Sequence, residues 1–244
     1  MGRHSREKKA RKALSDWTKD VLTRAHDGQR ASAAQIFQRS QTLEATVEAG
    51  MNAGDFYELA RKTLDEVFKP KLACRKGCSY CCHIPVAASL PEIVNALMFA
   101  RATFSPERYQ ALIERLARAD EVVRALGPER PRRNLACPFL ENDQCSVYEA
   151  RPVACRAWHS LEVEPCKAGY EHPEAPPETP TVAPVLYAGD AVREGLRLGL
   201  QDAYLDGQRL DLIRGAHWLA NDLEAMERWL AGVEVPEEVR FKTP

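Results

Sequence analysis

Apolar residues recur at intervals of three and four along most of the chain, which is the period of an amphipathic helix. One such stripe places five apolar residues on a single helical face: Leu112, Leu116, Ala119, Val123 and Leu126. Ser105 can cap this helix, and Pro106 suits its first turn because a proline there loses no helical hydrogen bond. The pattern therefore predicts a helix that begins at residue 106.

Two further stripes predict helices on either side. SLPE, at residues 89–92, is a capping-box pattern that opens a helix through Ile93, Leu97 and Phe104. Near the C-terminus, four apolar residues form another stripe: Leu219, Leu223, Met226 and Leu230. Such stripes at helical spacing indicate a packed core rather than a cofactor site.

Residues 7–68 predict two or three more helices, broken near AHDG at 25–28 and AGMNAGD at 49–55, where glycine disfavours helix. The proline-rich segment 163–184 predicts an irregular surface crossing in which only Cys166 suggests an anchor. Alternating strands are not apparent. We therefore expect an all-α fold, a helical domain with irregular cysteine-rich metal-binding loops.

The chain divides into three segments that we expect to form one compact unit. Residues 1–68 form an N-terminal helical segment, 69–170 a cysteine-cluster region, and 171–244 a proline-rich crossing with C-terminal helices. A chain of 244 residues is long enough to build a core without covalent staples, so its size does not explain its cysteines.

Net charge points to no particular partner. The formal charge of -1, with 45% hydrophobic and 28% charged residues, is ordinary for a globular protein. Six of the first twelve residues are Lys or Arg, and PERPRRN at 128–134 is a second basic segment. Neither has the interleaved aromatic residues that stack on bases in single-strand nucleic-acid binding. We therefore expect the basic segments to be solvated and expect no nucleic-acid or membrane partner. The sequence shows neither a secretory signal nor a membrane span, so we expect a cytoplasmic protein. It does not identify a protein partner.

Eight cysteines carry the chemistry. They form two groups of four: Cys74, Cys78, Cys81 and Cys82, then Cys137, Cys145, Cys155 and Cys166. In a reducing cytosol, closely spaced thiols predict metal ligands rather than disulfides. Four thiolates suit one tetrahedral zinc or one iron-sulfur cluster, and a single polynuclear centre shared by both groups is the competing arrangement. Cys81 and Cys82 point apart in an extended backbone, so they can serve different ions, or one can lie outside the ligand set.

Nearby side chains suggest supporting roles. Five cationic residues lie close in sequence to cysteines: Arg75, Lys76, Arg151, Arg156 and Lys167. They either offset the negative charge of thiolates or are solvated surface groups. His83 and His159 are candidate replacement ligands or hydrogen-bond partners of a cluster sulfur. Pro152 can start a short helix that places Cys155 one turn in, while Tyr148 and Arg151 orient the loop.

CRKGCSYC, at residues 74–81, locally resembles the signature of radical S-adenosylmethionine enzymes, in which three thiolates leave one iron of a cluster open. Those enzymes resemble partial α/β barrels. The chain lacks the strands alternating with helices that such a barrel needs, which argues against radical chemistry.

The second block, CPFLENDQCSVYEARPVACR at 137–156, extends the pattern. With CRKGCSYCC it resembles the YkgJ-type cysteine-cluster family of putative zinc- or iron-chelating domains over roughly residues 70–170. The resemblance implies that all eight cysteines are metal ligands. A flagellin lysine methylase is similar in its cysteine pattern and implies a cluster used with S-adenosylmethionine, but the chain shows no glycine-rich loop for that cofactor.

These observations predict a metal-binding cysteine-cluster protein with a structural, metal-handling or redox role. An iron-sulfur cluster is favoured narrowly over zinc, because a close run of cysteines plus remote ones suits a cluster, while structural zinc favours paired Cys-x2-Cys knuckles. The alternative is a metal-dependent enzyme related to the methylase, with catalytic residues that the sequence does not reveal.

Overall fold

The computed structural model describes residues 3–75, 77–222 and 224–242, with side chains from residue 7 onward. Nine α-helices dominate this described part, and its strands are only two residues long, which confirms the all-α prediction. No described helix is both long and apolar enough to cross a membrane.

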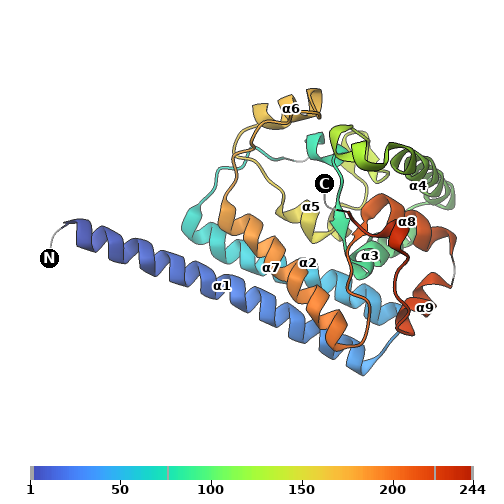
Figure 1. Ribbon diagram of the computed structural model, residues 1–244, viewed down its shortest axis with the longest axis horizontal. Coiled ribbons are helices and arrows are strands. Elements are labelled where there is room, and N and C mark those ends of the chain that lie inside the picture. Colours follow the sequence, from blue (N-terminus) through green and yellow to red (C-terminus); the bar gives the residue numbers. More distant parts are fainter. Residues whose placement is uncertain (1–2, 76, 223, 243–244) are drawn as a thin grey trace.

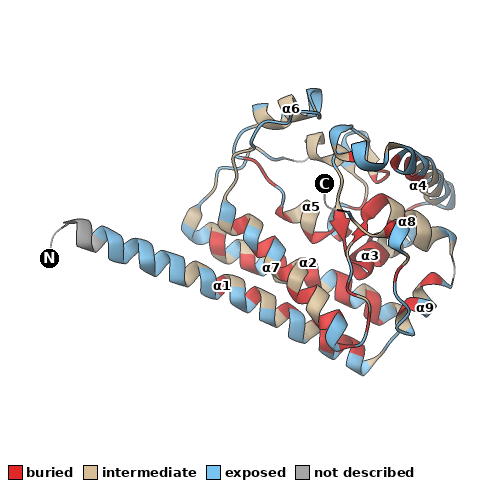
Figure 2. Ribbon diagram, viewed as in Figure 1, coloured by how far each residue is buried: buried red, intermediate tan, exposed pale blue. Residues whose placement is uncertain are grey.

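Three long helices pack side by side as a layer: α1 (Arg3–Arg39), α2 (Leu43–Phe68) and α7 (Ala183–Asp202). We call this layer the three-helix body. Figure 1 shows α1 along one edge of the molecule, with its N-terminal part extending beyond the neighbouring helices. Residues 7–16 of α1 are all exposed (Figure 2), and the first buried residue of the helix is Val21.

The predicted breaks near residues 25–28 and 49–55 are wrong, because both segments are helical. The glycines there allow close packing instead: a Cβ on Gly28 would lie 2.6 Å from Phe56 Cε1, and one on Gly50 would lie 2.3 Å from the Pro91 carbonyl oxygen. The true break follows Arg39, where Thr42 caps α2 by accepting a hydrogen bond from the Ala45 N–H.

The predicted capping box and the helix from residue 106 are confirmed. α3 (Leu90–Thr103) begins after Ser89, whose side chain pairs with the Glu92 N–H, and α4 (Pro106–Leu126) begins after Ser105. The predicted C-terminal stripe is split between α8 (Leu212–Asn221) and α9 (Ala225–Leu230). Asp222 separates them by accepting a hydrogen bond from the Glu224 N–H, and Leu223 lies outside the described residues.

The segment 163–184 is only partly irregular. α6 (Glu164–Glu171) occupies its first half, which the sequence prediction missed because Pro165 stands in the first turn, where proline is tolerated. The predicted short helix after Pro152 is confirmed as α5 (Val153–Ala157).

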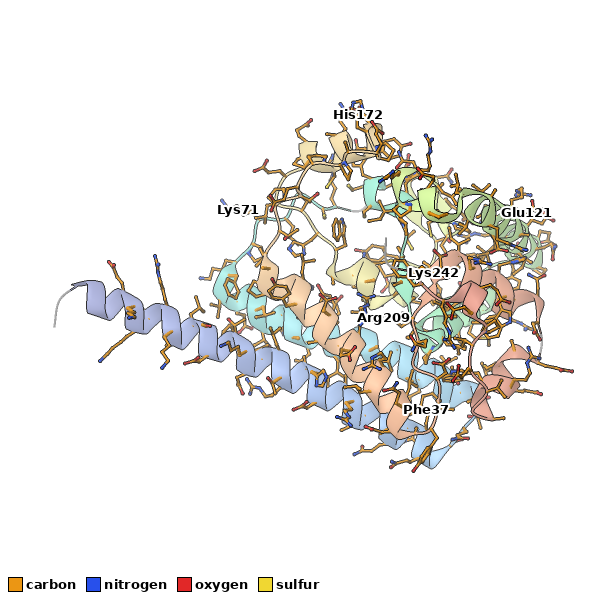
Figure 3. All side chains as sticks on the ribbon, in the orientation of Figure 1. Phe37, Lys71, Glu121, His172, Arg209 and Lys242 are labelled. Carbon is orange, nitrogen blue, oxygen red and sulfur yellow. The ribbon has the colours of Figure 1, made fainter. Side chains whose placement is uncertain are left out.

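Two small antiparallel pairs complete the fold. β1 (Ala87–Ala88) pairs with β4 (Leu210–Asp211), and β2 (Leu140–Glu141) pairs with β3 (Gln144–Cys145). In the part of the chain that the structure describes, four short 3-10 turns link the elements: η1 (Tyr80–His83), η2 (Gly127–Arg132), η3 (Tyr148–Ala150) and η4 (Glu237–Val239). Phe37, labelled in Figure 3, packs edge-on against Trp229 with ring centroids 5.6 Å apart and so joins α1 to α9.

Candidate metal centre

The eight cysteines come from η1 and the loop before it, the β2–β3 hairpin and the loop before it, α5 and α6. All are free thiols; Cys74 is exposed and the other seven are partly buried. Figure 1 shows α5 between the three-helix body and the segments that carry η1 and α6, on one side of the molecule. We call residues 73–83 and 134–172 the cysteine layer.

Backbone hydrogen bonds join the first cysteine run to the second. The Cys137 N–H donates to the Cys82 carbonyl oxygen at 2.8 Å, and the Leu135 N–H donates to that of His83 at 3.2 Å. The Ser79 hydroxyl donates to the Asp143 carboxylate at 2.9 Å. The two runs, more than fifty residues apart in sequence, therefore lie side by side.

The hairpin that carries Cys145 is held from α4. Asn142 and Asp143 form its turn with φ of 50° and 58°, a left-handed conformation that these residue types tolerate. Arg115 donates to the Pro138 carbonyl oxygen at 2.9 Å and pairs with Glu141 at 2.5 Å. Phe139, almost fully buried, anchors the hairpin in the core.

Buried Glu92 positions the helix that carries Cys155. One carboxylate oxygen accepts from the Val153 N–H at 2.8 Å, at the start of α5, and the other accepts from the Ser89 N–H at 2.7 Å. The residue that completes the capping box of α3 thus also caps α5, because a short helix leaves its first N–H groups without intrahelical partners.

Ser160 organises the opposite side of the layer. Its carbonyl oxygen accepts from the Ala73 N–H at 2.9 Å, and its own N–H donates to the Cys74 sulfur at 3.3 Å. Its hydroxyl accepts from the Glu162 N–H at 3.1 Å, while the Cys166 thiol donates to the Glu162 carbonyl oxygen at 3.9 Å. Cys74 and Cys166 are therefore placed by one short turn.

α6 rests on η1 through aromatic contacts. The Tyr170 ring lies 4.8 Å from the His83 ring and 5.8 Å from the Tyr80 ring, centroid to centroid. Asn134 donates a side-chain hydrogen bond to the Tyr170 carbonyl oxygen. Figure 3 places His172, just after α6, at the outer edge of the molecule, so α6 forms the rim of the cysteine layer.

The thiols are arranged differently from the two groups in the sequence. Loss of solvent around the sulfur, only partial for the exposed residue Cys74, is the main cause that raises the pKa of Cys74, Cys145, Cys155 and Cys166, and negative charge on Cys81 raises each further. Cys74 and Cys166 also interact with Cys78, whereas Cys155 interacts with Cys137 and Cys145. We call these sets the outer thiols (Cys74, Cys78 and Cys166) and the inner thiols (Cys137, Cys145 and Cys155). Cys81 interacts with both, so Cys166 joins the first run rather than the second.

The inner thiols strongly favour their protonated form without a metal. Burial raises the pKa of Cys137 to about 12 and that of Cys155 well above its ordinary value. A hydrogen bond with Cys82, followed by burial, raises the pKa of Cys81. Metal ligation requires thiolates, so metal uptake must release protons. Within the described residues, no three Cys, His, Asp or Glu side chains lie close enough to share one ion, and the ligand set stays a prediction.

Two of the predicted cations enter the site. Arg151 opposes the effect of burial on the pKa of Cys81, Cys145 and Cys155, and its guanidinium lies 3.9 Å from the centre of the Tyr148 ring. Arg156 donates to the Arg151 carbonyl oxygen at 2.9 Å and so supports it.

Two further predicted cations, Arg75 and Lys167, do not enter the site. Arg75 and Lys167 are exposed, and Lys167 approaches Glu171 on its own helix at 3.9 Å. Lys76 lies outside the described residues.

The sequence did not predict a role for Arg130, which belongs to the segment 128–134 that was expected to be solvated. It is only 5% exposed, and its positive charge opposes the effect of burial on the pKa of Cys137. Its neighbours Arg132 and Arg133 are exposed, so composition alone carries no signal that singles it out. The η2 turn decides which arginine of the segment faces inward.

The two candidate histidines have structural contacts. His159 is buried; its Nδ1 pairs with the Ala157 carbonyl oxygen at 2.8 Å, and its Nε2 accepts from the Val182 N–H at 2.9 Å, so both ring nitrogens are engaged. The Nδ1 of His83 pairs with the Ser79 carbonyl oxygen at 3.0 Å. His159 ties α5 to the start of α7, and His83 supports α6.

The donor set fits a thiolate-bound metal. Free thiols flanked by arginines suit zinc or an iron-sulfur cluster, because both prefer sulfur ligands and gain from cations that offset the resulting negative charge. In comparison with known families, residues 73–173 match the model of a "putative zinc- or iron-chelating domain" named for its CxxCxxCC pattern, which confirms the resemblance. No curated protein and no solved structure matches the chain.

Proposed function

We propose that this chelating domain holds an iron-sulfur cluster through its cysteine thiolates, with zinc as the competing occupant, in a cytoplasmic protein with a metal-handling, redox or structural role. The observation that carries the proposal is that Cys81 interacts electrostatically with free thiols of separate elements, Cys74, Cys145, Cys155 and Cys166, and that Arg151 acts on Cys81, Cys145 and Cys155.

The position of Cys81 supports a polynuclear centre. It interacts with outer and inner thiols alike, as expected for a ligand near the middle of a shared site. Four-cysteine zinc sites commonly use paired knuckles, and Cys78 and Cys81 are the one pair here at that spacing. Iron with inorganic sulfide fills a wider set of thiols than a single zinc ion does.

Solvent access favours metal handling or redox exchange over a purely structural role. Cys74 is exposed, and Cys166 stands on the rim helix α6, so the outer thiols can meet a partner or a chelator from solution. Of the inner thiols, Cys145 lies on β3, Cys155 on α5, and Cys137 beside a groove lined by α4. A centre with one accessible side can exchange a ligand without unfolding the layer.

A groove beside Cys137 keeps an enzyme as the second candidate. It encloses about 240 Å³ between α4 and residues 135–140, with Arg115 and Arg118 beside apolar Val122 and Leu135. A metal-dependent enzyme related to the flagellin lysine methylase needs such a space next to its centre for S-adenosylmethionine or substrate. If so, adding S-adenosylmethionine to the loaded protein will shift its visible absorption.

The deciding experiment is metal and acid-labile sulfide analysis, with visible absorption, on protein purified without air and without a metal-binding tag. Iron and sulfide in similar amounts support the cluster, and zinc without sulfide supports the competing occupant. Protein with neither metal and with paired thiols would contradict metal binding.

Two matched variants test the ligand assignment. Cys81→Ser should lose most of the metal, whereas Cys74→Ser, at the exposed edge, should retain more of it. If Cys81→Ser keeps both its fold and its full metal content, Cys81 is not a ligand.

A further inference from the structure

Tyr57 presents a fully buried hydroxyl with no hydrogen-bond partner. The residue is 0% exposed, and its oxygen bonds to no described protein atom. The Nε of Arg151 is likewise buried and unpartnered. Asp65 Oδ1, a buried acceptor that also acts electrostatically on Tyr57, forms no hydrogen bond with it. Buried polar groups without partners are costly, so these two donors call for an acceptor.

The Tyr57 ring packs near the helix that carries Cys155. A Cβ placed on Gly189 would lie 3.8 Å from Tyr57 Cε2 and 3.8 Å from Val153 Cγ1. The Tyr57 ring therefore lies close to α5, the helix that carries both Val153 and Cys155. One turn earlier on α2, a Cβ on Gly54 would lie 3.3 Å from the guanidinium of Arg156, the neighbour of Cys155. The three-helix body therefore presents Tyr57 to the inner side of the cysteine layer.

Charge connects the same groups. Arg61, Glu58, Asp65 and Arg151 all act electrostatically on the Tyr57 hydroxyl, and Arg151 also acts on the thiols of Cys81, Cys145 and Cys155. Arg151 is therefore near both the hydroxyl and these thiols. Burial raises the pKa of Tyr57, and the hydroxyl keeps its proton at neutral pH. It is a donor in need of an acceptor.

We propose that the Tyr57 hydroxyl and the Arg151 Nε–H donate hydrogen bonds to an anionic sulfur of the loaded metal centre, either a cysteine thiolate or an inorganic sulfide. The inference rests on the proposed function. Hydrogen bonds to metal-bound sulfur withdraw electron density from it, which raises the reduction potential of an iron centre and moves sulfur-to-metal absorption to higher energy. Tyr57 is thus a positioning and tuning residue supplied by the body to the centre.

The test compares Tyr57→Phe with Tyr187→Phe, an exposed tyrosine on α7 that serves as the matched control. Each variant and the wild type are loaded separately with Co²⁺, a sulfide-free probe of the thiolates, and with iron plus sulfide. Loss of the Tyr57 hydroxyl should leave metal content unchanged. It should shift the sulfur-to-cobalt band to longer wavelength or move the iron reduction potential to a more negative value, while Tyr187→Phe matches the wild type.

The two arms distinguish the acceptors. A shift in the cobalt protein identifies a thiolate, and a shift confined to the iron-sulfide protein identifies inorganic sulfide. If Tyr57→Phe matches Tyr187→Phe in every form that loads, the inference is overturned while metal binding stands. Wild-type protein that takes up neither metal would overturn the proposed function and, with it, this inference.

Arg151→Lys provides an independent check should Tyr57→Phe fail to fold. Lysine keeps the positive charge but has no Nε–H at the same place. A shift of the cobalt band or of the iron potential in the same direction supports the donor role. A loaded Arg151→Lys protein with wild-type band and potential, in the absence of a folded Tyr57→Phe, counts against the inference.

Discussion

The three-helix body and the cysteine layer are held together in opposite ways. The body packs backbone against backbone: Ala33, Ala49, Ala53 and Ala188 are 0% exposed, and glycines on α7 meet α1 directly. The cysteine layer is built from short turns that depend on single polar contacts, such as those of Glu92 and Ser160. The body therefore carries its own packing energy, whereas the layer gains from ligands that join its pieces.

The largest expected effect comes from breaking the body. A Cβ on Gly199 would lie 2.4 Å from the Arg30 carbonyl oxygen, too close for any side chain. We expect Gly199→Val to lower the free energy of unfolding by about 4 kcal/mol, because the helices must separate. Urea unfolding measures it. Gln201→Val, which adds the same side chain at an exposed position of α7, is the control, and equal loss in both would argue against close packing.

Metal removal should separate the two regions most clearly. We expect a strong chelator to reduce hydrogen-exchange protection in residues 73–83 and 134–172 by about 3 kcal/mol, the linkage expected at roughly a hundredfold excess over Kd. α2 and α7 should keep their protection. Hydrogen exchange read by mass spectrometry measures this, and uniform loss across the chain would contradict the division into two regions.

Glu92 connects the regions, so its replacement should weaken their junction. Glu92→Gln removes the acceptor for either the Val153 N–H or the Ser89 N–H, and we expect a loss of about 2 kcal/mol in the free energy of unfolding. Thermal unfolding measures it. Glu107→Gln, in the exposed first turn of α4, is the matched control and should change little. A Glu92→Gln protein as stable as its control would show that α5 needs no cap.

Tyr170→Ala should loosen only the rim. Loss of its contacts with His83 and Tyr80 should reduce the stability of α6 docking by about 1 kcal/mol and speed metal release to a chelator about fivefold. Stopped-flow transfer to a coloured chelator measures the rate. Tyr187→Ala should release metal at the wild-type rate, and unchanged release from Tyr170→Ala would mean that α6 does not control access.

The smallest effect is a pH dependence of the metal-free protein. The folded state raises the pKa of Cys137 from an ordinary value of 9.0 to about 12, so stability is fully present below pH 9 and is lost as pH rises toward 12. At pH 10 one such group costs about 1 kcal/mol, and less if the layer opens locally. Unfolding midpoints at pH 8 and 10 measure it. Cys137→Ala should show a shallower loss, and an identical slope would assign the titration elsewhere.

The sequence predicts local features well where a residue acts on its neighbours. Ser89 and Ser105 cap helices, Pro152 precedes one, and the cysteine pattern matches the family model over residues 73–173, because capping and cysteine spacing are short-range properties. The helix breaks predicted at Gly28 and Gly50 are wrong, because a glycine that disfavours an isolated helix also permits a close contact between two helices.

The amino-acid sequence by itself determined the helical class, the presence of eight thiols and their likeness to a chelating domain. Only the tertiary structure decided which thiols lie together, with Cys166 beside the first run, and which cations face them, with Arg130 and Arg151 turned inward and Arg75 left in solvent. It also placed the Tyr57 ring beside α5, the helix that carries Cys155. The reason is physical: burial and electrostatic coupling depend on contacts between segments distant in sequence, which no local pattern encodes.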